Sequence, residues 1–200
     1  IIEAYHTDQR VFLGDIFDDF WYTPADAELT ARWYAGILAD PTNICLLGNH
    51  DVPYAYYNRA FLCSGFTPTK SLAIGKYLDT VDWAKTKLYQ FVDGYCLSHA
   101  GVWKEWIDEL PDALDQAQQA LHRERAPSKW LGAGYTRGGN QVVGGVTWLD
   151  WNEEFEDVEG FPQIVGHTQG REPRRKGGSL CLDTCLRHVA EEIFWPCFAG

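Results

Sequence analysis

Four short polar blocks hold most of the residues in this sequence that can do chemistry. In chain order they are Gly14-Asp15-Ile16-Phe17-Asp18, Gly48-Asn49-His50-Asp51, Ser98-His99-Ala100-Gly101 and Gly166-His167-Thr168. Each block follows a short apolar run that is typical of a buried strand, and open α/β sheets bind their ligands at the carboxyl ends of strands. We therefore expect the blocks to gather on one rim. Carboxylate, amide and imidazole ligands without a thiolate suit Mn²⁺, Fe or Zn²⁺.

The segments between the blocks indicate the elements that position them. Thr23 followed by Pro24 predicts a helix that runs to about Ala39, because a hydroxyl cap and a proline at the first helical position are both favourable. Asp93-Gly94 predicts a hairpin turn between the segments 87–91 and 95–98. Further predicted features are strands at 11–13, 44–47 and 95–97, helical sequence over 103–125, a glycine-rich loop over 132–145, and strands near 146–149, 163–165, 179–182 and 187–194.

The four blocks in this order resemble the signature of the calcineurin-like metallophosphoesterase superfamily, which reads DxH, GDxxD, GNH followed by Asp or Glu, a His, and GH. Among the branches of that superfamily the chain is most similar to the Ser/Thr protein phosphatases. A single His followed by Thr168 is in the style of that branch, and 148–150 and 179–184 are similar to two of its segments. The chain departs from the branch at Asp19, where an arginine binds phosphate, and at Asp51, where a Glu stands.

The first motif of the signature, DxH, has no counterpart among the thirteen residues before Gly14, and the chain contains no methionine. Three explanations stay open: the chain begins inside a longer protein, methionines have dropped out of the sequence as written, or one metal site has been lost. The resemblance implies an α/β fold of two mixed β-sheets packed as a sandwich and flanked by helices, here without its first strand. It implies a single metallophosphoesterase domain over 1–200 that is incomplete at its N-terminus.

The resemblance also implies a cofactor of two divalent metal ions, with Mn²⁺ preferred and Fe or Zn²⁺ as alternatives. Asp15 would bridge the two ions, and three further ligands, Asn49, His99 and His167, would complete the second metal. Such a pair of ions activates a water molecule and neutralises phosphate charge.

His50 directly follows the Asn ligand, and the resemblance implies that it is the catalytic acid that protonates the leaving group. Such an acid needs a partner that holds its tautomer and raises its pKa. Asp18 is the first candidate for that partner and Asp51 the second, and Asp51 is equally well suited to cap the helix that follows it. Arg137, in the glycine-rich loop, either replaces the missing phosphate-binding arginine, since a guanidinium fork matches phosphate, or is a plain solvent-exposed residue.

These features predict the hydrolysis of a phosphomonoester in the style of a protein phosphatase, with a small phosphoester or a phosphoprotein as substrate. A nucleotide or dinucleoside-polyphosphate hydrolase is the alternative that would use the same core. The alternative from another class is a binding scaffold that keeps the fold and has lost catalysis. Retention of His50 beside an intact set of ligands argues against the scaffold.

The composition indicates which classes of binding partner and which cellular compartment to expect. The 200 residues carry a net charge of −11, which disfavours a long nucleic acid because phosphate neutralisation needs clustered Lys and Arg. No apolar stretch approaches the roughly 20 residues of a membrane span, so we expect no membrane partner. The six cysteines form no CxxC pair and are expected to be reduced thiols of a cytoplasmic protein. His122 is expected on the surface of a helix, outside the site.

Overall fold

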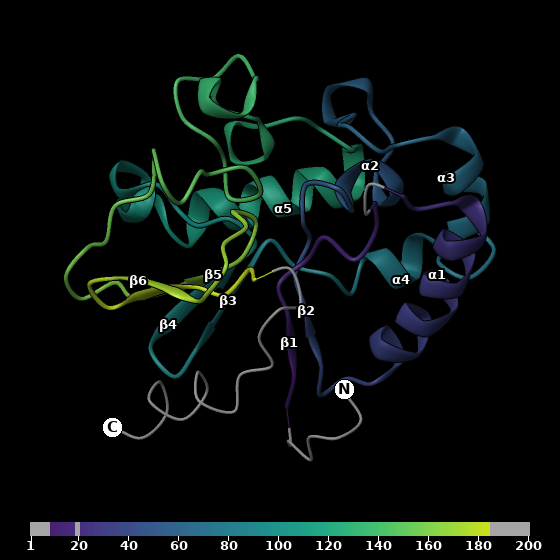
Figure 1. The fold of residues 1–200 in the computed structure, drawn as a ribbon, viewed down its shortest axis with the longest axis horizontal. Coiled ribbons are helices and arrows are strands. Elements are labelled where there is room, and N and C mark those ends of the chain that lie inside the picture. Colours follow the sequence, from purple (N-terminus) through teal and green to yellow (C-terminus); the bar gives the residue numbers. More distant parts are fainter. Residues whose placement is uncertain (1–8, 19–20, 185–200) are drawn as a thin grey trace. The chain divides into compact units, whose positions relative to one another are not determined.

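The structure is a computed structural model that describes residues 9–18 and 21–184 (Figure 1). Its internal contacts divide the chain into two compact units, Ile1–Lys87 and Leu88–Gly200, which we call unit 1 and unit 2. The expectation of a single domain over 1–200 stays a prediction.

Unit 1 combines a short parallel sheet with helices. β1 (Val11–Phe12) pairs in parallel with β2 (Ile44–Cys45), so that Val11 lies opposite Ile44 and Phe12 opposite Cys45. The other elements are α1 (Pro24–Ala39), which connects the two strands, α2 (Val52–Ala55), a 3₁₀ turn (Arg59–Phe61), α3 (Pro68–Ile74) and α4 (Thr80–Trp83). Because the two strands are parallel, the loops that follow them begin at the same edge of the sheet.

α1 begins and ends where the sequence predicts. The Thr23 hydroxyl accepts a hydrogen bond from the amide of Asp26, and the Asp26 carboxylate accepts one from the amide of Thr23, which makes a capping box. The buried face of the helix repeats at helical spacing and consists of Ala27, Ala31, Tyr34 and Leu38. The Tyr34 ring contacts the rings of Phe17 and Trp83. This aromatic core therefore anchors the first polar block, to which Phe17 belongs.

Unit 2 is built on a mixed five-stranded sheet in the order β3-β4-β5-β7-β6. Its strands are β3 (Tyr89–Val92), β4 (Tyr95–Ser98), β5 (Gln163–Val165), β6 (Arg174–Lys176) and β7 (Ser179–Cys181). The three central strands β4, β5 and β7 are parallel, and the two edge strands are antiparallel to their neighbours. A core packs beside the sheet and consists of Ala100, Val143, Leu149, Trp151, Phe155, Val165 and Cys181.

Helical segments and loops connect these strands. A 3₁₀ helix (Lys104–Glu109) and α5 (Asp112–Glu124) follow β4, so the predicted helical stretch 103–125 is confirmed, with its break at Pro111. The predicted glycine-rich loop is also confirmed, since it holds only a 3₁₀ turn (Tyr135–Arg137) after another such turn (Lys129–Leu131). The predicted hairpin is confirmed as β3 and β4, with Asp93 and Gly94 both at positive φ.

One strand prediction is wrong, and another falls outside the described residues. The segment 146–149 is a turn, because the amides of Trp148 and Leu149 both donate to the carbonyl of Gly145. Its apolar residues, which suggested a strand, are buried in a loop: Leu149 is fully buried and Val146 nearly so. The strand expected at 187–194 lies outside the described residues. The coarser expectation, an α/β chain with a mixed sheet and helices, is confirmed.

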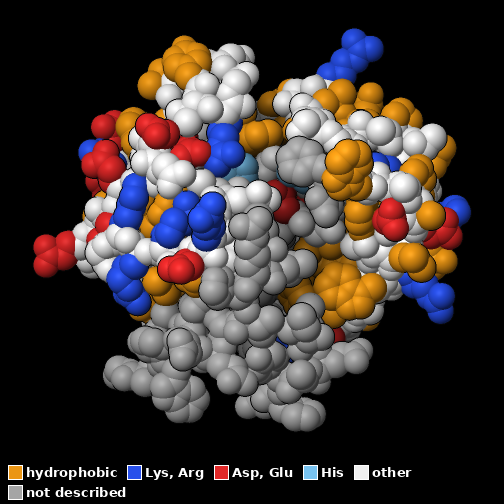
Figure 2. Space-filling view, viewed as in Figure 1, with side chains coloured by type: hydrophobic (Ala, Val, Ile, Leu, Met, Phe, Trp, Pro, Cys, Tyr) orange, Lys and Arg blue, Asp and Glu red, His pale blue; other side chains and the backbone are white. Residues whose placement is uncertain are grey.

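The surface of each unit has a distinct character. Figure 2 shows hydrophobic side chains over the part of unit 1 that α1 and α3 build, where Leu29 and Leu72 are 67% and 75% exposed. It shows Lys and Arg side chains over β6, which carries Arg174, Arg175 and Lys176. Within the described ranges, no helix combines the length and the apolar character needed to cross a membrane.

Candidate active site

The first two polar blocks meet in unit 1 because the loops after β1 and β2 approach each other closely. Gly14 has a φ of +92°, and a Cβ atom there would lie 2.3 Å from the amide nitrogen of Gly48. A Cβ atom on Gly48 would lie 2.1 Å from Oδ1 of Asp15. Both positions therefore require glycine, one for its backbone conformation as well as for space.

Asp51 ties these two loops together. Its carboxylate accepts hydrogen bonds from the amides of Asp15 (2.7 Å), Ile16 (2.9 Å) and Gly48 (2.9 Å), and the residue is 1% exposed. The alternative role of helix cap is wrong, because the Asp51 side chain makes no capping hydrogen bond to α2. Its predicted catalytic role stays a prediction, beside a clear structural one.

Asp15 and Asn49 lie in the same pair of loops. Oδ1 of Asp15 accepts a hydrogen bond of 2.9 Å from the amide of His50, and Asp15 has a φ of +54°. Asn49 is 3% exposed. The backbone amide that Asp15 binds is that of the predicted acid, so this contact fixes where the His50 side chain begins.

His50 faces the carboxylate of Asp18. Its Nδ1 atom lies 3.8 Å from Oδ2 of Asp18, an ion-pair separation, and 3.6 Å from Sγ of Cys63. The His50 side chain is 22% exposed and the Asp18 side chain is fully buried. The structure thus places the first-choice partner, Asp18, against the predicted acid.

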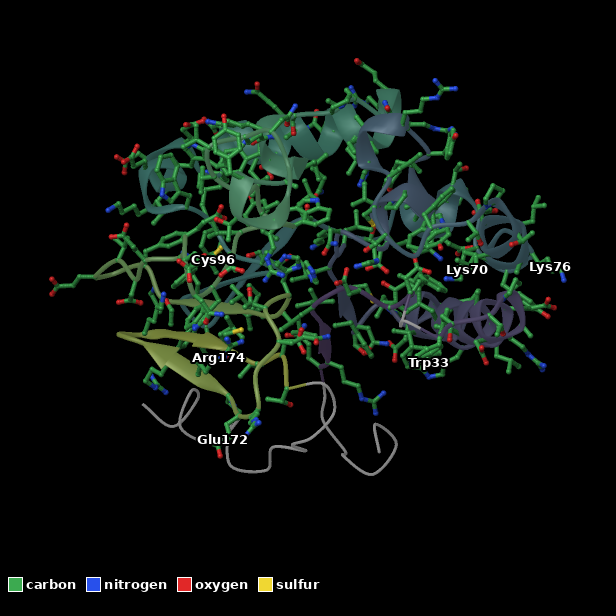
Figure 3. The ribbon with its side chains drawn as sticks, turned by 45° about the horizontal axis from the view of Figure 1, so that its top comes forward. Trp33, Lys70, Lys76, Cys96, Glu172 and Arg174 are labelled. Atoms are coloured by element: carbon green, nitrogen blue, oxygen red, sulfur yellow. The ribbon has the colours of Figure 1, made fainter. Side chains whose placement is uncertain are left out.

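Asp18 in turn is held by two residues that the sequence analysis did not identify. Nζ of Lys70 donates to Oδ1 of Asp18 at 2.8 Å, and the Tyr54 hydroxyl lies 2.8 Å from both carboxylate oxygens. Lys70 comes from α3, and Figure 3 labels its side chain. These contacts join segments 36 and 52 residues apart in the chain, so no local pattern signals them.

The charges of this cluster shift its pKa values in opposite directions. Burial raises the pKa of Asp18, but the interactions with His50, Lys70 and Tyr54 outweigh it, so the pKa falls below its ordinary value. Burial lowers the pKa of His50, but the interactions with Asp18 and Cys63 and the charge of Asp15 outweigh it, so the pKa rises above its ordinary value. A raised pKa favours the protonated imidazole, which is the form that can donate a proton.

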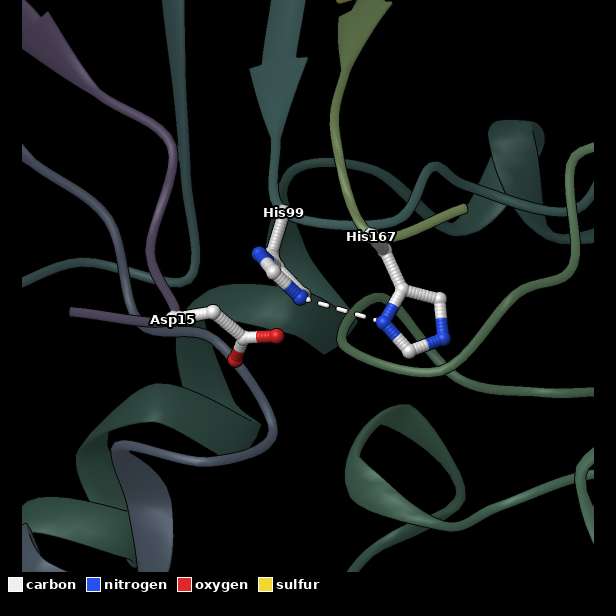
Figure 4. Close-up of side chains that lie close together, drawn as sticks. All are labelled: Asp15, His99 and His167. Atoms are coloured by element: carbon white, nitrogen blue, oxygen red, sulfur yellow. Dashed lines mark hydrogen bonds between the residues drawn. The ribbon is translucent and has the colours of Figure 1, made fainter. Parts of the chain in front are cut away.

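The last two polar blocks meet in unit 2 because β4 and β5 are parallel neighbours. Nε2 of His99 lies 3.2 Å from Nδ1 of His167 (Figure 4). His99 is 2% exposed, His167 has a φ of +63°, and the ring of Trp148 packs edge-on against the His167 ring at 5.8 Å between centroids. These two histidines therefore lie together at one edge of this sheet, and the predicted gathering of all four blocks on one rim stays a prediction.

Arg137 reaches the loop that carries His167. Its Nη2 atom lies 2.7 Å from Oδ2 of Asp150 and 2.8 Å from Oγ1 of Thr168. The Thr168 hydroxyl oxygen also accepts a hydrogen bond from the amide of Trp151 at 2.9 Å. The Arg137 side chain is 29% exposed, so it is a braced, partly buried residue and not a free loop arginine. His122 lies on α5 and is half-buried.

Comparison with known proteins identifies the fold. No protein-family model matches the chain, and no curated protein matches it. The fold is similar to a cold-active protein-tyrosine phosphatase of a psychrophile, Shewanella sp., with a TM-score of 0.57 and 18% identity over 90% of this chain and 61% of that one. A point mutant of a cold-active protein tyrosine phosphatase gives a TM-score of 0.59 with 18% identity, again over 90% and 61% of the two chains.

A third structure of a cold-active protein tyrosine phosphatase gives a TM-score of 0.54 and 19% identity, over 90% of this chain and 60% of that one. At this level of identity the likeness defines a shared fold. The chain spans about three fifths of the length of these phosphatases.

These findings correct two expectations. The assignment to the calcineurin-like metallophosphoesterase superfamily is wrong, because the solved structures that share this fold are described as protein tyrosine phosphatases. The expected cofactor of two divalent metal ions rested on that assignment and is contradicted with it. The general α/β class holds, and the specific metallophosphoesterase sandwich is not supported.

The physical reason for the wrong assignment lies in the loops themselves. The two glycines are required by the close approach of the backbones, and Asp51 is required by three backbone amides. Asp15 binds the amide of His50. Loop bonding thus accounts for the glycines and for two of the aspartates in the first two blocks, so that part of the pattern is less specific for one superfamily than its order suggested.

Proposed function

We propose that this protein is a phosphoester hydrolase that acts on phosphomonoesters, with His50 as the general acid and Asp18 as the partner of that acid. One observation carries the proposal: the His50 imidazole faces a fully buried carboxylate that other side chains hold in place. The phosphatases that share the fold support the reaction class. The substrate is a small phosphoester or a phosphoprotein, and the setting is cytoplasmic.

In the proposed reaction a water oxygen forms a bond to phosphorus while the bond between phosphorus and the ester oxygen breaks. The ester oxygen keeps the bonding electron pair and takes a proton from His50. The proton released by the attacking water restores the imidazolium, so the products are an alcohol or phenol and inorganic phosphate. Proton transfer of this kind contributes about 10²–10⁴-fold to the rate.

Arg137 remains a proposed phosphate-binding residue within unit 2. Its side chain is 29% exposed, and its Nη2 atom is held by Asp150 and Thr168, which fixes the orientation of the guanidinium. A planar guanidinium binds phosphate through paired donors. Arg137→Met should therefore raise KM for a phosphomonoester more than it lowers kcat.

The test is release of inorganic phosphate from phenyl phosphate and from a phosphotyrosine peptide. Each assay is run with a chelator and with added divalent cations, so that the result does not depend on which ions happen to be present. The proposal expects turnover that His50→Asn and Asp18→Asn reduce and that the matched control His122→Asn leaves unchanged. Turnover that is absent under every condition, or unaffected by His50→Asn, would contradict it.

A further inference from the structure

Lys70 is an unusual residue to find inside unit 1. It is 6% exposed, and burial of a lysine is costly unless its charge is paired. Its Nζ atom has two partners, Oδ1 of Asp18 and the carbonyl of Gly65, each at 2.8 Å. The Thr67 hydroxyl caps α3 by accepting a hydrogen bond from the amide of Lys70, which places this side chain in the first turn of the helix.

Tyr54 completes the environment of the same carboxylate. Its hydroxyl lies 2.8 Å from both oxygens of Asp18, and its ring packs against Phe17 and Phe66. Gly65 closes over the other side, since a Cβ atom there would lie 3.0 Å from the Asp18 side chain. The carboxylate therefore has little freedom to rotate.

The division of the two carboxylate oxygens points to a role. Lys70 binds Oδ1, whereas Oδ2 is the oxygen that faces Nδ1 of His50 at 3.8 Å. We propose that Lys70 and Tyr54 are positioning residues that hold Asp18 with Oδ2 turned toward His50. This inference rests on the proposed function, in which His50 is the acid.

A purely stabilising role is a poor explanation for this arrangement. A buried ion pair is weak evidence for stability, because apolar side chains of the same volume often stabilise a core as well or better. If Asp18 is the partner of a catalytic His50, by contrast, its carboxylate must be held in one orientation, and this requires other groups that bind it. Lys76, just beyond α3, offers the contrast: its ion pair with Glu28 is on the surface, and its side chain is 58% exposed. Figure 3 labels both lysines.

The test compares two substrates with the same phosphoryl group and different leaving groups. p-Nitrophenolate leaves readily without a proton, whereas the phenolate of phenyl phosphate depends on the acid. Because general acid catalysis supplies about 10²–10⁴-fold, we expect Lys70→Met and Tyr54→Phe to lower kcat for phenyl phosphate about tenfold more than for p-nitrophenyl phosphate. Lys76→Met should change neither rate. A merely structural role would lower both rates equally.

The outcomes separate this inference from the proposed function. If His50→Asn lowers kcat equally for phenyl phosphate and p-nitrophenyl phosphate, the proposed function fails and the inference fails with it. The other case is that His50→Asn lowers kcat more for phenyl phosphate than for p-nitrophenyl phosphate, while Lys70→Met and Tyr54→Phe lower both rates equally or not at all. In that case only the positioning role is overturned. Tyr54→Phe removes one oxygen and keeps the packed ring, so it decides the matter even if Lys70→Met does not fold.

Discussion

Nζ of Lys70 lies 2.8 Å from Oδ1 of Asp18, and the two side chains are only 7% and 0% exposed. This pair links α3 to the loop after β1, and through that loop to the imidazole of His50. It is the point in unit 1 where stability and the proposed chemistry depend on the same contact, so substitutions there should affect both.

Removal of the lysine charge should destabilise the protein strongly. Lys70→Met removes the ammonium that is hydrogen-bonded to the buried Asp18 carboxylate and leaves His50 as its one facing cation among the described residues, and breaking a buried ion pair from one side costs about 3–5 kcal/mol. The measurement is the free energy of unfolding in urea. Lys76→Met, which breaks an exposed pair, should change it little, and equal effects of the two substitutions would argue against a buried pair.

The same carboxylate should make stability depend on pH in the acid range. The folded pKa of Asp18 is lowered, while the unfolded value is about 3.9. Its contribution to stability is therefore present above the unfolded pKa and is lost as the pH falls through the folded pKa. Urea unfolding at a series of pH values should show the difference between wild type and Asp18→Asn shrinking as the pH falls. A difference that grows toward acid pH would contradict the assignment.

Two glycine substitutions separate the close packing of the loops after β1 and β2 from the energetic cost of a positive φ. Gly14 and Gly94 have φ values of +92° and +82°, but only Gly14 has atoms near its missing Cβ, whereas Gly94 has none within 4 Å. Gly94→Ala should cost about 1–2 kcal/mol, the penalty of a left-handed backbone. Gly14→Ala should cost clearly more, because the backbone of Gly48 must move. Equal losses in thermal unfolding would mean that the loops do not pack as described.

The hydrogen bond between Arg137 and Thr168, next to His167, should couple the effects of substituting these two residues on the free energy of unfolding. Thr168→Val removes the hydroxyl that binds both Arg137 and the amide of Trp151, and Arg137→Met removes the guanidinium. Residues that share a hydrogen bond couple by about 0.5–3 kcal/mol in a double-mutant cycle. Unfolding free energies of the two single variants and the double variant give that coupling, and a value near zero would show that the contact is not formed.

Local signals predicted the elements well. The cap at Thr23-Pro24 and the Asp93-Gly94 turn depend on neighbouring residues only, and both are observed. The rule that ligands gather at the carboxyl ends of strands predicted that all four polar blocks share one rim. The first two blocks meet within unit 1 and the last two within unit 2, and the common rim of all four stays a prediction. Asp18, the first of the two candidates for the partner of His50, lies 3.8 Å from Nδ1 of that residue.

Long-range contacts could not be predicted in this way. Lys70 lies 52 residues from Asp18, and an isolated lysine at the start of a helix is normally a solvated residue. The segment 146–149 was predicted as a strand from its apolar residues, but burial does not distinguish a strand from a packed turn. The family assignment failed for a related reason, because glycine and aspartate in a loop report backbone bonding as readily as metal binding.

The most direct test of the central claim is the leaving-group dependence of the His50 variant. kcat/KM is measured for phenyl phosphate and for p-nitrophenyl phosphate with wild type, His50→Asn and the control His122→Asn. We predict that His50→Asn loses about 10²–10⁴-fold on phenyl phosphate and far less on p-nitrophenyl phosphate, while the control matches wild type. Equal losses on both substrates, or no loss on either, would contradict the role of His50 as the general acid.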